Sequence, residues 1–407
     1  MKLKLHWQIL IALILGVIAG IMFPQFVQYF SWIGDIFLRA LGLIVVPLIL
    51  CSIVTSLIDI RKSKFDLKST GTKTIGLYVM TMVIAIITGW ALVRIIQPGV
   101  GVEMISGADA LDSFEQKTLS EILINIVPNN LFAAFSSNNT LPVILIAFLF
   151  GLFIPKIDFK YQSGFENMFK GGLDLMTKIT NFIIKLAPFG IFAIVAKQFS
   201  LTSNFLALME NMMMYVLTVS IGLAIHTFVW LQLIMRYGFR VNPWKHMSNM
   251  STPLLTAFST ASSGATLPLT LHAVEHKNGV SKDITNFTIP LGTAINMDGT
   301  ALLECVGVIF IAQVYGIELS FMHQLLVAFT ALLSAVGAAA IPMGGLVTMT
   351  IILYAVGLPI EGIGLIIGVD RILDMMRTSV NVYGDTCVAV MVAKIEKETL
   401  PIDIKQK

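Results

Sequence analysis

The residues best suited to chemistry in this 407-residue sequence form a polar run near its C-terminus. Aspartates, an arginine, a threonine and an asparagine recur there between apolar residues, at Asp370, Asp374, Arg377, Thr378, Asn381 and Asp385. At about 100° per residue, these positions fall within an arc of about 100° on one face of a helix. We therefore predict a polar stripe that runs down an otherwise apolar helix.

The composition of the chain places this helix inside a membrane. Hydrophobic residues make up 56% of the sequence, charged residues only 13%, and the mean hydropathy is +0.84. Soluble domains carry about 25% charged residues, so most of this chain is expected in hydrocarbon. Ionisable groups in a membrane helix are costly and usually mark a substrate or ion pathway. The formal net charge of +3 is too small to indicate a nucleic-acid partner.

An internal salt-bridge network is the alternative interpretation of the stripe. Arg377 would then pair with Asp374 or Asp370. Even so, the carboxylates of Asp370, Asp374 and Asp385 outnumber the guanidinium groups of Arg371 and Arg377. The excess negative charge favours a bound cation.

A second polar segment, at residues 292–300, interrupts an apolar stretch with the sequence Gly-Thr-Ala-Ile-Asn-Met-Asp-Gly-Thr. These residue types suit an unwound turn whose free carbonyl groups bind Na⁺ in transporters. Asp298 or Asp385 would supply the compensating charge. Glu304 follows Thr300 by one helical turn and is expected to face the same cavity.

The elements that must position these residues are apolar segments of spanning length. They lie at 7–27, 33–60, 73–97, 120–155, 170–199, 208–236, 283–314 and 361–392. We predict an all-α polytopic membrane protein with about eight transmembrane helices. The first segment is interpreted as a spanning helix because no small-residue cleavage pattern follows it. Cys51, Cys305 and Cys387 each lie in an apolar stretch, which indicates buried thiols rather than disulfides.

Two further apolar stretches, 246–276 and 321–355, are interrupted near the middle by small residues and a proline. Such breaks predict two re-entrant helical hairpins, since paired Gly/Pro-interrupted segments point to a transport site. The alternative is two kinked ordinary helices. Lys and Arg mark cytoplasmic loops, and the acidic loop at 103–115 would face outside. This charge pattern places both termini in the cytoplasm and requires the hairpins to enter from opposite sides.

These motifs together resemble the glutamate transporter family, the dicarboxylate/amino acid:cation symporters. The resemblance rests on Asn-Met-Asp-Gly-Thr at 296–300, the Ser-rich tip of the first hairpin, and the spaced residues from Asp374 to Asp385. Pro188-Phe189-Gly190-Ile191-Phe192 also resembles a family signature. The similarity covers nearly the whole chain and implies an inverted-repeat fold.

The resemblance implies a substrate site for aspartate or glutamate. Arg377 would bind the side-chain carboxylate and Asp374 the amino group, because a planar guanidinium matches a carboxylate bidentately. Polar contacts are implied for Thr378, Asn381 and Thr300, and backbone contacts for Ala261, Ser263, Ile341 and Gly345. Family members that handle acidic amino acids often have a second arginine, where this chain has Ala261 or Met375. Acidic specificity would therefore depend on Arg377.

The resemblance also implies about two or three Na⁺ sites. The first would combine carbonyl groups of Gly292, Asn296 and Asn381 with the Asp385 carboxylate. The second would use carbonyl groups of Ala294, Ala335, Val336 and Ala338. The third would use Tyr78, Thr81, Asn296 and Asp298, although Met82 stands where the family often has a small hydroxyl residue.

Glu304 lies at a position that differs among members of the resembled family. Animal members of the family have glutamate at the matching position and return with K⁺ while they carry a proton. We hypothesise that Glu304 exchanges a proton during transport and permits coupling to H⁺ or to K⁺ as a counter-ion. The alternative is a hydrogen-bonded structural acid.

The resemblance further implies two discontinuous domains. Residues 1–60 and 120–199 would form a scaffold and trimerisation domain, and residues 73–97 and 208–397, with both hairpins, a transport domain. The transport domain would move across the cell membrane like an elevator, in a homotrimer.

Other functions remain alternatives at this point. Within the family, the substrate could be a C4-dicarboxylate or a neutral amino acid. A passive channel is also open, because polar stripes line pores. The run His272-Ala273-Val274-Glu275-His276 matches the H-x-x-E-H pattern of some zinc peptidases, but zinc would need a third protein ligand.

Overall fold

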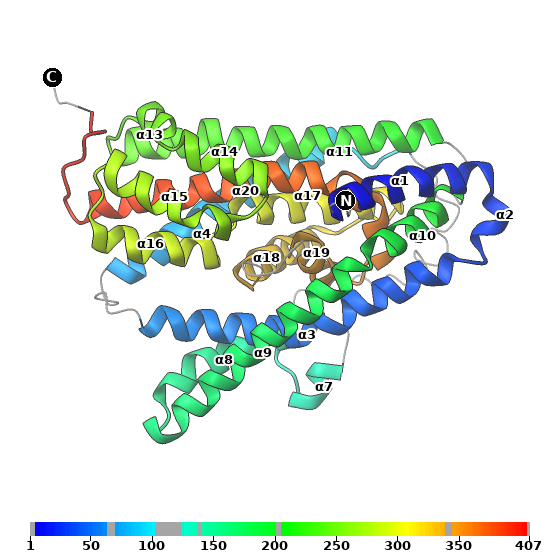
Figure 1. Ribbon diagram of the computed structural model, residues 1–407, viewed down its shortest axis with the longest axis horizontal. Coiled ribbons are helices and arrows are strands. Elements are labelled where there is room, and N and C mark those ends of the chain that lie inside the picture. Colours follow the sequence, from blue (N-terminus) through cyan, green and yellow to red (C-terminus); the bar gives the residue numbers. More distant parts are fainter. Residues whose placement is uncertain are drawn as a thin grey trace.

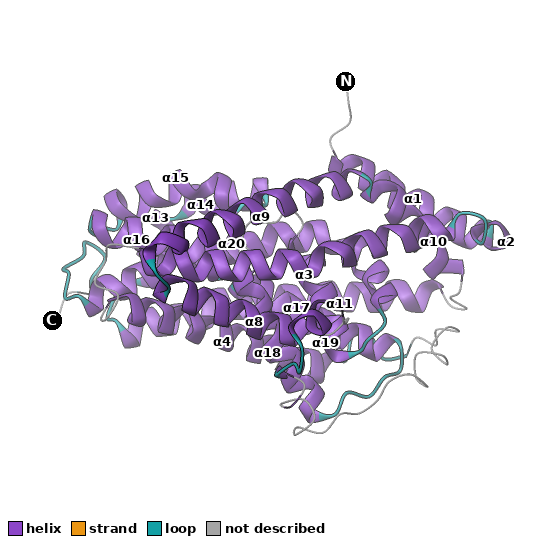
Figure 2. Ribbon diagram, turned by 90° about the horizontal axis from the view of Figure 1, so that it is seen from below, coloured by secondary structure: helices purple, strands orange, loops and turns teal. Residues whose placement is uncertain are grey.

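A computed structural model of the chain describes residues 5–62, 70–101, 124, 126–136, 140–200, 205–337 and 344–404. The regular structure of these residues is helical, apart from one isolated bridge between Val241 and Asp403. Figure 2 shows the described residues as helices joined by loops. The predicted all-α class is confirmed. Ala338, Ile341 and the acidic loop at 103–115 lie outside the described residues.

The helices fall into two groups in Figure 1. The α3 group comprises α1 (Leu5–Met22), α3 (Ser31–Lys62), α8 (Thr140–Phe153), α9 (Phe159–Lys185) and α10 (Ala187–Ser200), with the short α2 (Pro24–Val27) and α7 (Leu131–Ser136). The α20 group comprises α4 (Thr72–Ile96), α11 (Phe205–Ile225), α12 (Leu231–Leu233), α13 (Pro243–Asn249), α14 (Ser251–Thr260), α15 (Ser263–His272), α16 (Lys282–Ile295), α17 (Asp298–Val314), α18 (Phe321–Gly337), α19 (Gly344–Val356) and α20 (Ile363–Ile395). The groups meet where α18 and α19 pack on α3, and where α20 packs on α10.

Small residues allow helices of the α3 group to approach closely. A side chain at Gly16 would lie 2.8 Å from the carbonyl oxygen of Phe192, and one at Gly20 would lie 2.6 Å from that of Ala196. These glycines are four residues apart, so both face α10. Close backbone approach through small residues is a usual basis of helix packing in membranes, because apolar burial gives little gain in lipid.

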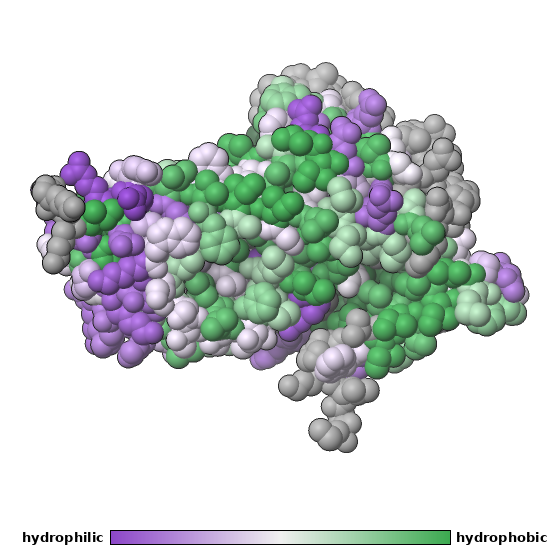
Figure 3. Space-filling model, turned by 90° about the horizontal axis from the view of Figure 1, so that it is seen from above, coloured by the Kyte–Doolittle hydropathy of each residue, from purple (hydrophilic) through white to green (hydrophobic). Residues whose placement is uncertain are grey.

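The lengths of the helices agree with membrane crossing. Within the described ranges, four helical runs are long and apolar enough to span: Ser31–Ile58, Thr72–Ile96, Leu206–Gly238 and Lys282–Val314. The α9–α10 pair would be a fifth if it is one span. The stripe of charges lowers the hydropathy of α20, although that helix is 33 residues long. Figure 3 shows apolar surface over the middle of the molecule and hydrophilic residues at the end that carries the C-terminus. The total of eight spans stays a prediction.

Several predicted segments differ in detail from the observed helices. The segment at 170–199 is two helices, α9 and α10, bent by 57° about Leu186. Its first helix also begins earlier, at Phe159, where the Asp158 side chain accepts a hydrogen bond from the Lys160 amide. Charged residues between 160 and 170 hide this start from a search for apolar runs. The segment at 283–314 breaks at Asn296 and Met297, where the unwound turn was predicted.

The interrupted stretches form hairpins rather than kinked helices. The arms α14 and α15 pack on each other, and so do α18 and α19. At the first tip, Ala261 adopts a left-handed conformation with φ of 49° and ends α14. Ser262 then caps α15 by accepting a hydrogen bond from the Ala265 amide. The Ser-rich sequence is therefore what allows the chain to reverse there.

The segment that follows α20 connects several elements at the hydrophilic end of the α20 group. Glu396 accepts hydrogen bonds from Thr70 and Lys73 at the start of α4, at 2.9 and 3.1 Å. The Glu398 side chain accepts from the amide of Ser281, which caps α16. Pro401 packs against Gly279. We call residues 396–404 the C-terminal strap, because they hold three separate elements together.

Replacing Glu396 by glutamine should lower thermal stability slightly at neutral pH. Hydrogen bonds from Lys73 and Thr70 hold the pKa of Glu396 below its ordinary value of 4.5. The ionised carboxylate therefore stabilises the fold above that ordinary value, and the stabilisation is lost as pH falls through the lower folded-state pKa. The loss should be about 0.5 kcal/mol, as for a partly exposed pair.

The measurement is the thermal unfolding of wild-type and variant protein in detergent, from pH 7 down to pH 4. The difference between the two should shrink as the pH falls. Asp174→Asn is the matched control, because Asp174 pairs with Lys178 on the surface of α9 without joining separate elements. An equal effect from both variants would contradict the role of the strap.

Candidate substrate and cation site

The predicted polar stripe on α20 faces the interior of the α20 group. Its side chains are all buried: Asp370, Asp374, Arg377, Thr378, Asn381 and Asp385. Helices α11, α14, α16 and α17 pack around α20 and cover this face. By contrast, the Arg371 side chain is 46% exposed. The polar side chains are thus removed from lipid and directed towards one another.

Arg377 and Asp374 form the central ion pair of this interior. The Nε atom of Arg377 donates to Oδ1 of Asp374 at 2.9 Å, and Nη2 lies 2.8 Å from the same oxygen. The salt-bridge alternative is thus partly realised. However, the Nη1 atom of Arg377 is buried and has no hydrogen-bond partner. A buried donor without a partner is costly, so this nitrogen is ready to bind a carboxylate that enters the site.

Two glycines allow the backbone to pack against Arg377. A Cβ atom at Gly345, in the first turn of α19, would collide with the guanidinium group. A Cβ atom at Gly299, at the start of α17, would lie 2.8 Å from the Arg377 carbonyl oxygen. The hairpin of α18 and α19, which we call the outer hairpin after its predicted side of entry, and the break between α16 and α17 therefore both meet at this arginine. The hairpin of α14 and α15 is correspondingly called the inner hairpin.

Asn381 joins the break to α20 by its side chain. Its Oδ1 atom accepts a hydrogen bond from the Gly299 amide at 2.7 Å, and its Nδ2 atom donates to Thr300 Oγ1 at 3.1 Å. Both residues lie in the first turn of α17, whose amide groups lack partners within the helix. The structure thus brings Thr300, Asn381 and Arg377 close together, with the buried Thr378 beside them.

The tip of the inner hairpin is placed less directly. The arms α14 and α15 both pack on α20, and the Ser379 hydroxyl donates to the Leu254 carbonyl oxygen at 3.2 Å. Ala261 and Ser263 lie at the partly exposed tip. Among the described residues, no hydrogen bond joins either of them to Arg377.

Oxygen-bearing residues gather on the other side of the broken helix. Asn296 donates from Nδ2 to Oδ1 of Asp385 at 3.0 Å, and its Oδ1 accepts from Thr81 at 3.4 Å. A Cβ atom at Gly292 would lie 2.5 Å from Asp385 Oδ1 and 2.8 Å from the Tyr78 hydroxyl. The predicted first and third cation sites are therefore adjacent, and they share Asn296.

Asp298 completes this cluster. It is fully buried, its Oδ2 atom lies 3.1 Å from Nε2 of His226, and its Oδ1 atom has no hydrogen-bond partner. Carboxylate and carbonyl oxygens are hard ligands of the kind that bind Na⁺ at broken helices. These oxygen ligands, together with the unpartnered buried Oδ1 atom of Asp298, therefore fit a small hard cation.

The residues predicted for the second cation site lie at the end of α18. Ala335 is buried, and both Ala335 and Val336 belong to the last turn of that helix. The last carbonyl groups of a helix lack intrahelical partners, so they remain available as ligands. Ala294 lies on α16, which packs on α18.

Sequence reasoning missed His226. This histidine begins a π-helical turn, η3 (His226–Trp230), and is fully buried against Asp298. A lone histidine within an apolar spanning segment was the signal available in the sequence, because such a residue needs a polar partner. Its contact with Asp298 makes it a neighbour of the third predicted cation site.

Glu304 lies one turn into α17 and is fully buried. Its Oε1 atom accepts a hydrogen bond from the Thr348 hydroxyl on α19, while Oε2 has no hydrogen-bond partner. Arg377 lies within electrostatic range of the carboxylate. Glu304 therefore faces the same interior as Arg377.

The two histidines of the zinc-peptidase alternative do not form a metal site. The rings of His272 and His276 stack on the protein surface at 4.4 Å. In the part of the chain that the structure describes, no group of three or more His, Cys, Asp or Glu residues could hold a metal ion. The motif is a histidine pair at the base of the inner hairpin.

Comparisons with known proteins agree with this arrangement. The chain is 35% identical to the proton/sodium-glutamate symport protein of Bacillus caldotenax, over 97% of this chain and 95% of that one. It is 32% identical to the proton/glutamate-aspartate symporter of Escherichia coli (strain K12), over 97% and 93%. It is 33% identical to excitatory amino acid transporter 3 of Homo sapiens, over 98% and 87%. The sodium:dicarboxylate symporter family matches residues 5–395, so the chain belongs to that family of multi-pass membrane transporters.

Proposed function

We propose that this protein is a secondary active symporter that imports an acidic amino acid, aspartate or glutamate, together with Na⁺. Members of its family are symporters rather than enzymes. The observation that carries the choice of substrate is the buried Arg377, whose Nη1 atom has no partner and points to an anionic ligand. The relatives named for glutamate or aspartate transport support the same choice.

The proposed substrate site uses the groups around Arg377. The guanidinium would bind the side-chain carboxylate, and Asp374, which already bonds to Arg377, would also accept the ammonium group. Thr378, Asn381 and Thr300 would add polar contacts. Backbone groups near Ala261, Ser263, Ile341 and Gly345 would bind the α-carboxylate. A C4-dicarboxylate or a neutral amino acid would leave Asp374 or Arg377 without its ligand.

The proposed Na⁺ sites use the oxygens on the other side of the broken helix. Asp385 with Gly292, Asn296 and Asn381 would form one site, and Tyr78, Thr81, Asn296 and Asp298 a second. Carbonyl groups of Ala294, Ala335, Val336 and Ala338 would form a third. Each Na⁺ that moves inward gains about 2.3 kcal/mol per 100 mV, so about two or three ions suffice to concentrate the substrate.

Replacing Arg377 by glutamine should reduce Na⁺-dependent uptake of aspartate and glutamate by about 100-fold, since a charge-assisted bond to the substrate is lost. The measurement is the uptake of radiolabelled substrate into proteoliposomes with imposed Na⁺ gradients. Arg371→Gln is the matched control, because Arg371 lies on the same helix and is 46% exposed. Full uptake by the Arg377 variant, or wild-type uptake that does not depend on Na⁺, would overturn the proposal. Concentrative uptake also distinguishes a symporter from a channel.

The two packing groups support an elevator mechanism. Residues 73–97 and 208–397 would move as a transport domain against a scaffold of residues 1–60 and 120–199. The broken helix and the stripe lie within the first of these sets, so substrate and ions would travel with it. We further propose a homotrimer in the cytoplasmic membrane with both termini in the cytoplasm.

If transport requires the α20 group to slide against the α3 group, a disulfide between the two groups should stop uptake. A Cβ atom at position 364 of α20 would lie 3.7 Å from Cβ of Ile194 on α10. This separation falls in the range of about 3.5–4.5 Å found in disulfides. Ile194→Cys with Gly364→Cys, in a Cys51→Ala background, should therefore lose uptake on oxidation and regain it on reduction.

The matched control for this cross-link lies within the α3 group. A Cβ atom at Gly172 would lie 3.9 Å from Cβ of Cys51, so Gly172→Cys should form a disulfide inside the scaffold and leave uptake intact. Undiminished uptake after complete oxidation of the 194–364 pair would rule out the elevator movement.

We also propose that Glu304 exchanges a proton and couples transport to H⁺ or counter-transported K⁺. Glu304→Gln should then preserve substrate exchange across the membrane but remove the dependence of net uptake on external pH and internal K⁺. Both are measured in proteoliposomes, with the exposed Glu210→Gln as control. If pH and K⁺ dependence are unchanged, Glu304 is a structural acid held by Thr348.

A further inference from the structure

The first turn of α19 contacts both charged groups of the substrate interior. Gly345 packs on the guanidinium group of Arg377. Three residues later, the Thr348 hydroxyl bonds to the Glu304 carboxylate, and the Gly345 carbonyl oxygen at 3.2 Å is a second acceptor within the helix. Residues three apart lie on the same helix face, so one short surface of the outer hairpin contacts the arginine and the acid together.

We propose that Thr348 is a positioning residue that joins the outer hairpin to Glu304, so that proton binding at Glu304 changes how firmly the hairpin is held. This inference rests on the proposed proton exchange at Glu304. A hydroxyl bond to an ionised carboxylate is roughly twice as strong as one between neutral groups. The hairpin is therefore held more firmly when Glu304 is ionised and less firmly after it takes up a proton.

Substrate binding acts on the same contact through Arg377. The positive charge of Arg377 lies within electrostatic range of Glu304. A bound carboxylate shares that positive charge and so favours proton uptake by Glu304. Thr348 then transmits the change to α19.

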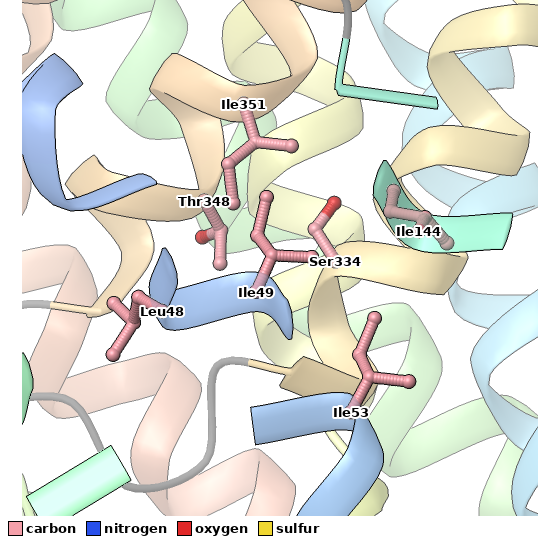
Figure 4. A pocket seen from close by; sticks show the side chains of 7 residues that line it. All are labelled: Leu48, Ile49, Ile53, Ile144, Ser334, Thr348 and Ile351. Carbon is pink, nitrogen blue, oxygen red and sulfur yellow. The ribbon is translucent and has the colours of Figure 1, made fainter. Parts of the chain in front are cut away.

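The cavity beside Thr348 offers little room for a water molecule that could replace its hydroxyl. Thr348 lines a cavity of about 10 Å³ between the hairpin and α3, together with Ser334 and the aliphatic side chains of Leu48, Ile49 and Ile53 (Figure 4). This volume is at the lower limit for one water molecule, which needs two or more polar partners. The Ser334 hydroxyl donates to the Thr330 carbonyl oxygen, so only its oxygen is left to accept from such a water. In Thr348→Val, which keeps the volume of the side chain, the carboxylate therefore loses this donor.

Other titratable groups on the helices around α17 are placed differently. The buried ones are Tyr78 of α4, Tyr215 of α11, His323 of α18, Asp370, Asp374, Arg377, Tyr383, Asp385 and Cys387 of α20, and Asp298 and Cys305 of α17 itself. Tyr78 donates to the Thr288 carbonyl oxygen, His323 contacts Ser320, and Asp374 bonds to Arg377. The hydroxyl of Tyr354 on α19 lies against Gly42 of α3. Thr348 is thus the side chain of the outer hairpin that a test of this contact should replace.

The test is the pH profile of Na⁺-dependent uptake by Thr348→Val in proteoliposomes. Removal of a donor to the ionised carboxylate favours the protonated acid, so the half-maximal point of the profile should move to higher pH by about one unit. Thr348→Ser should restore the wild-type profile. Thr348→Ala is the second variant and is expected to behave as Thr348→Val. In the Glu304→Gln background, neither variant should shift the profile.

Two control variants separate positioning from packing. Thr350 is equally buried on α19, but its hydroxyl donates only to the Leu346 carbonyl oxygen, so Thr350→Val should leave the profile unchanged. Ser334→Ala changes the same cavity without a contact to Glu304 and should also leave it unchanged.

Amide hydrogen exchange of residues 344–356 supplies the readout of the hairpin itself. After correction for intrinsic rates, exchange in the wild type should increase as Glu304 is protonated, and exchange in Thr348→Val should not depend on pH. A wild-type pH profile in Thr348→Val overturns the role of Thr348, provided that Glu304→Gln alters that profile. If Glu304→Gln alters neither pH nor K⁺ dependence, the proposed coupling itself fails.

Discussion

The buried positive charge of Arg377 is the constraint on which the α20 group depends. A guanidinium group within a bilayer requires an opposite charge and hydrogen bonds, and Asp374 supplies both one turn away on the same helix. The neighbouring chain must also come close without side chains of its own, which Gly299 and Gly345 permit. Because these contacts satisfy only part of the guanidinium, Nη1 retains its capacity to bind. The same arrangement that makes the charge tolerable thus leaves it available to an anion.

The break between α16 and α17 places a cation region beside this arginine. The unwound residues put Asn296 against Asp385 and Thr81, and they turn Asp298 towards His226. Asn381 bonds to both residues that open α17, so the stripe and the break form one polar interior. Positive and negative ligands on adjacent sides of this interior would compensate each other's charge. Such compensation explains why an acidic solute and Na⁺ are favoured together rather than separately.

Much of this interior could be predicted from the sequence, because polar residues in an apolar chain are few and their periodicity is that of a helix. The stripe, the unwound turn at 292–300 and the reversal at the Ser-rich tip all have local signals. The early start of α9 was hidden by the charged residues between 160 and 170, although Asp158 caps the helix there, and the bend at Leu186 was not predicted. His226 and Thr348 were missed for a related reason. Each lies in a mainly apolar segment, and its partner lies 72 or 44 residues away in the chain.

The C-terminal strap sets an order of events during biosynthesis. Glu396 pairs with Thr70 across a separation of 326 residues. At about 5–20 residues per second, synthesis of the intervening chain takes roughly 15–65 seconds. The start of α4 therefore lacks this partner until almost all later helices have been synthesised. Completion of the α20 group in this respect waits for the synthesis of residue 396.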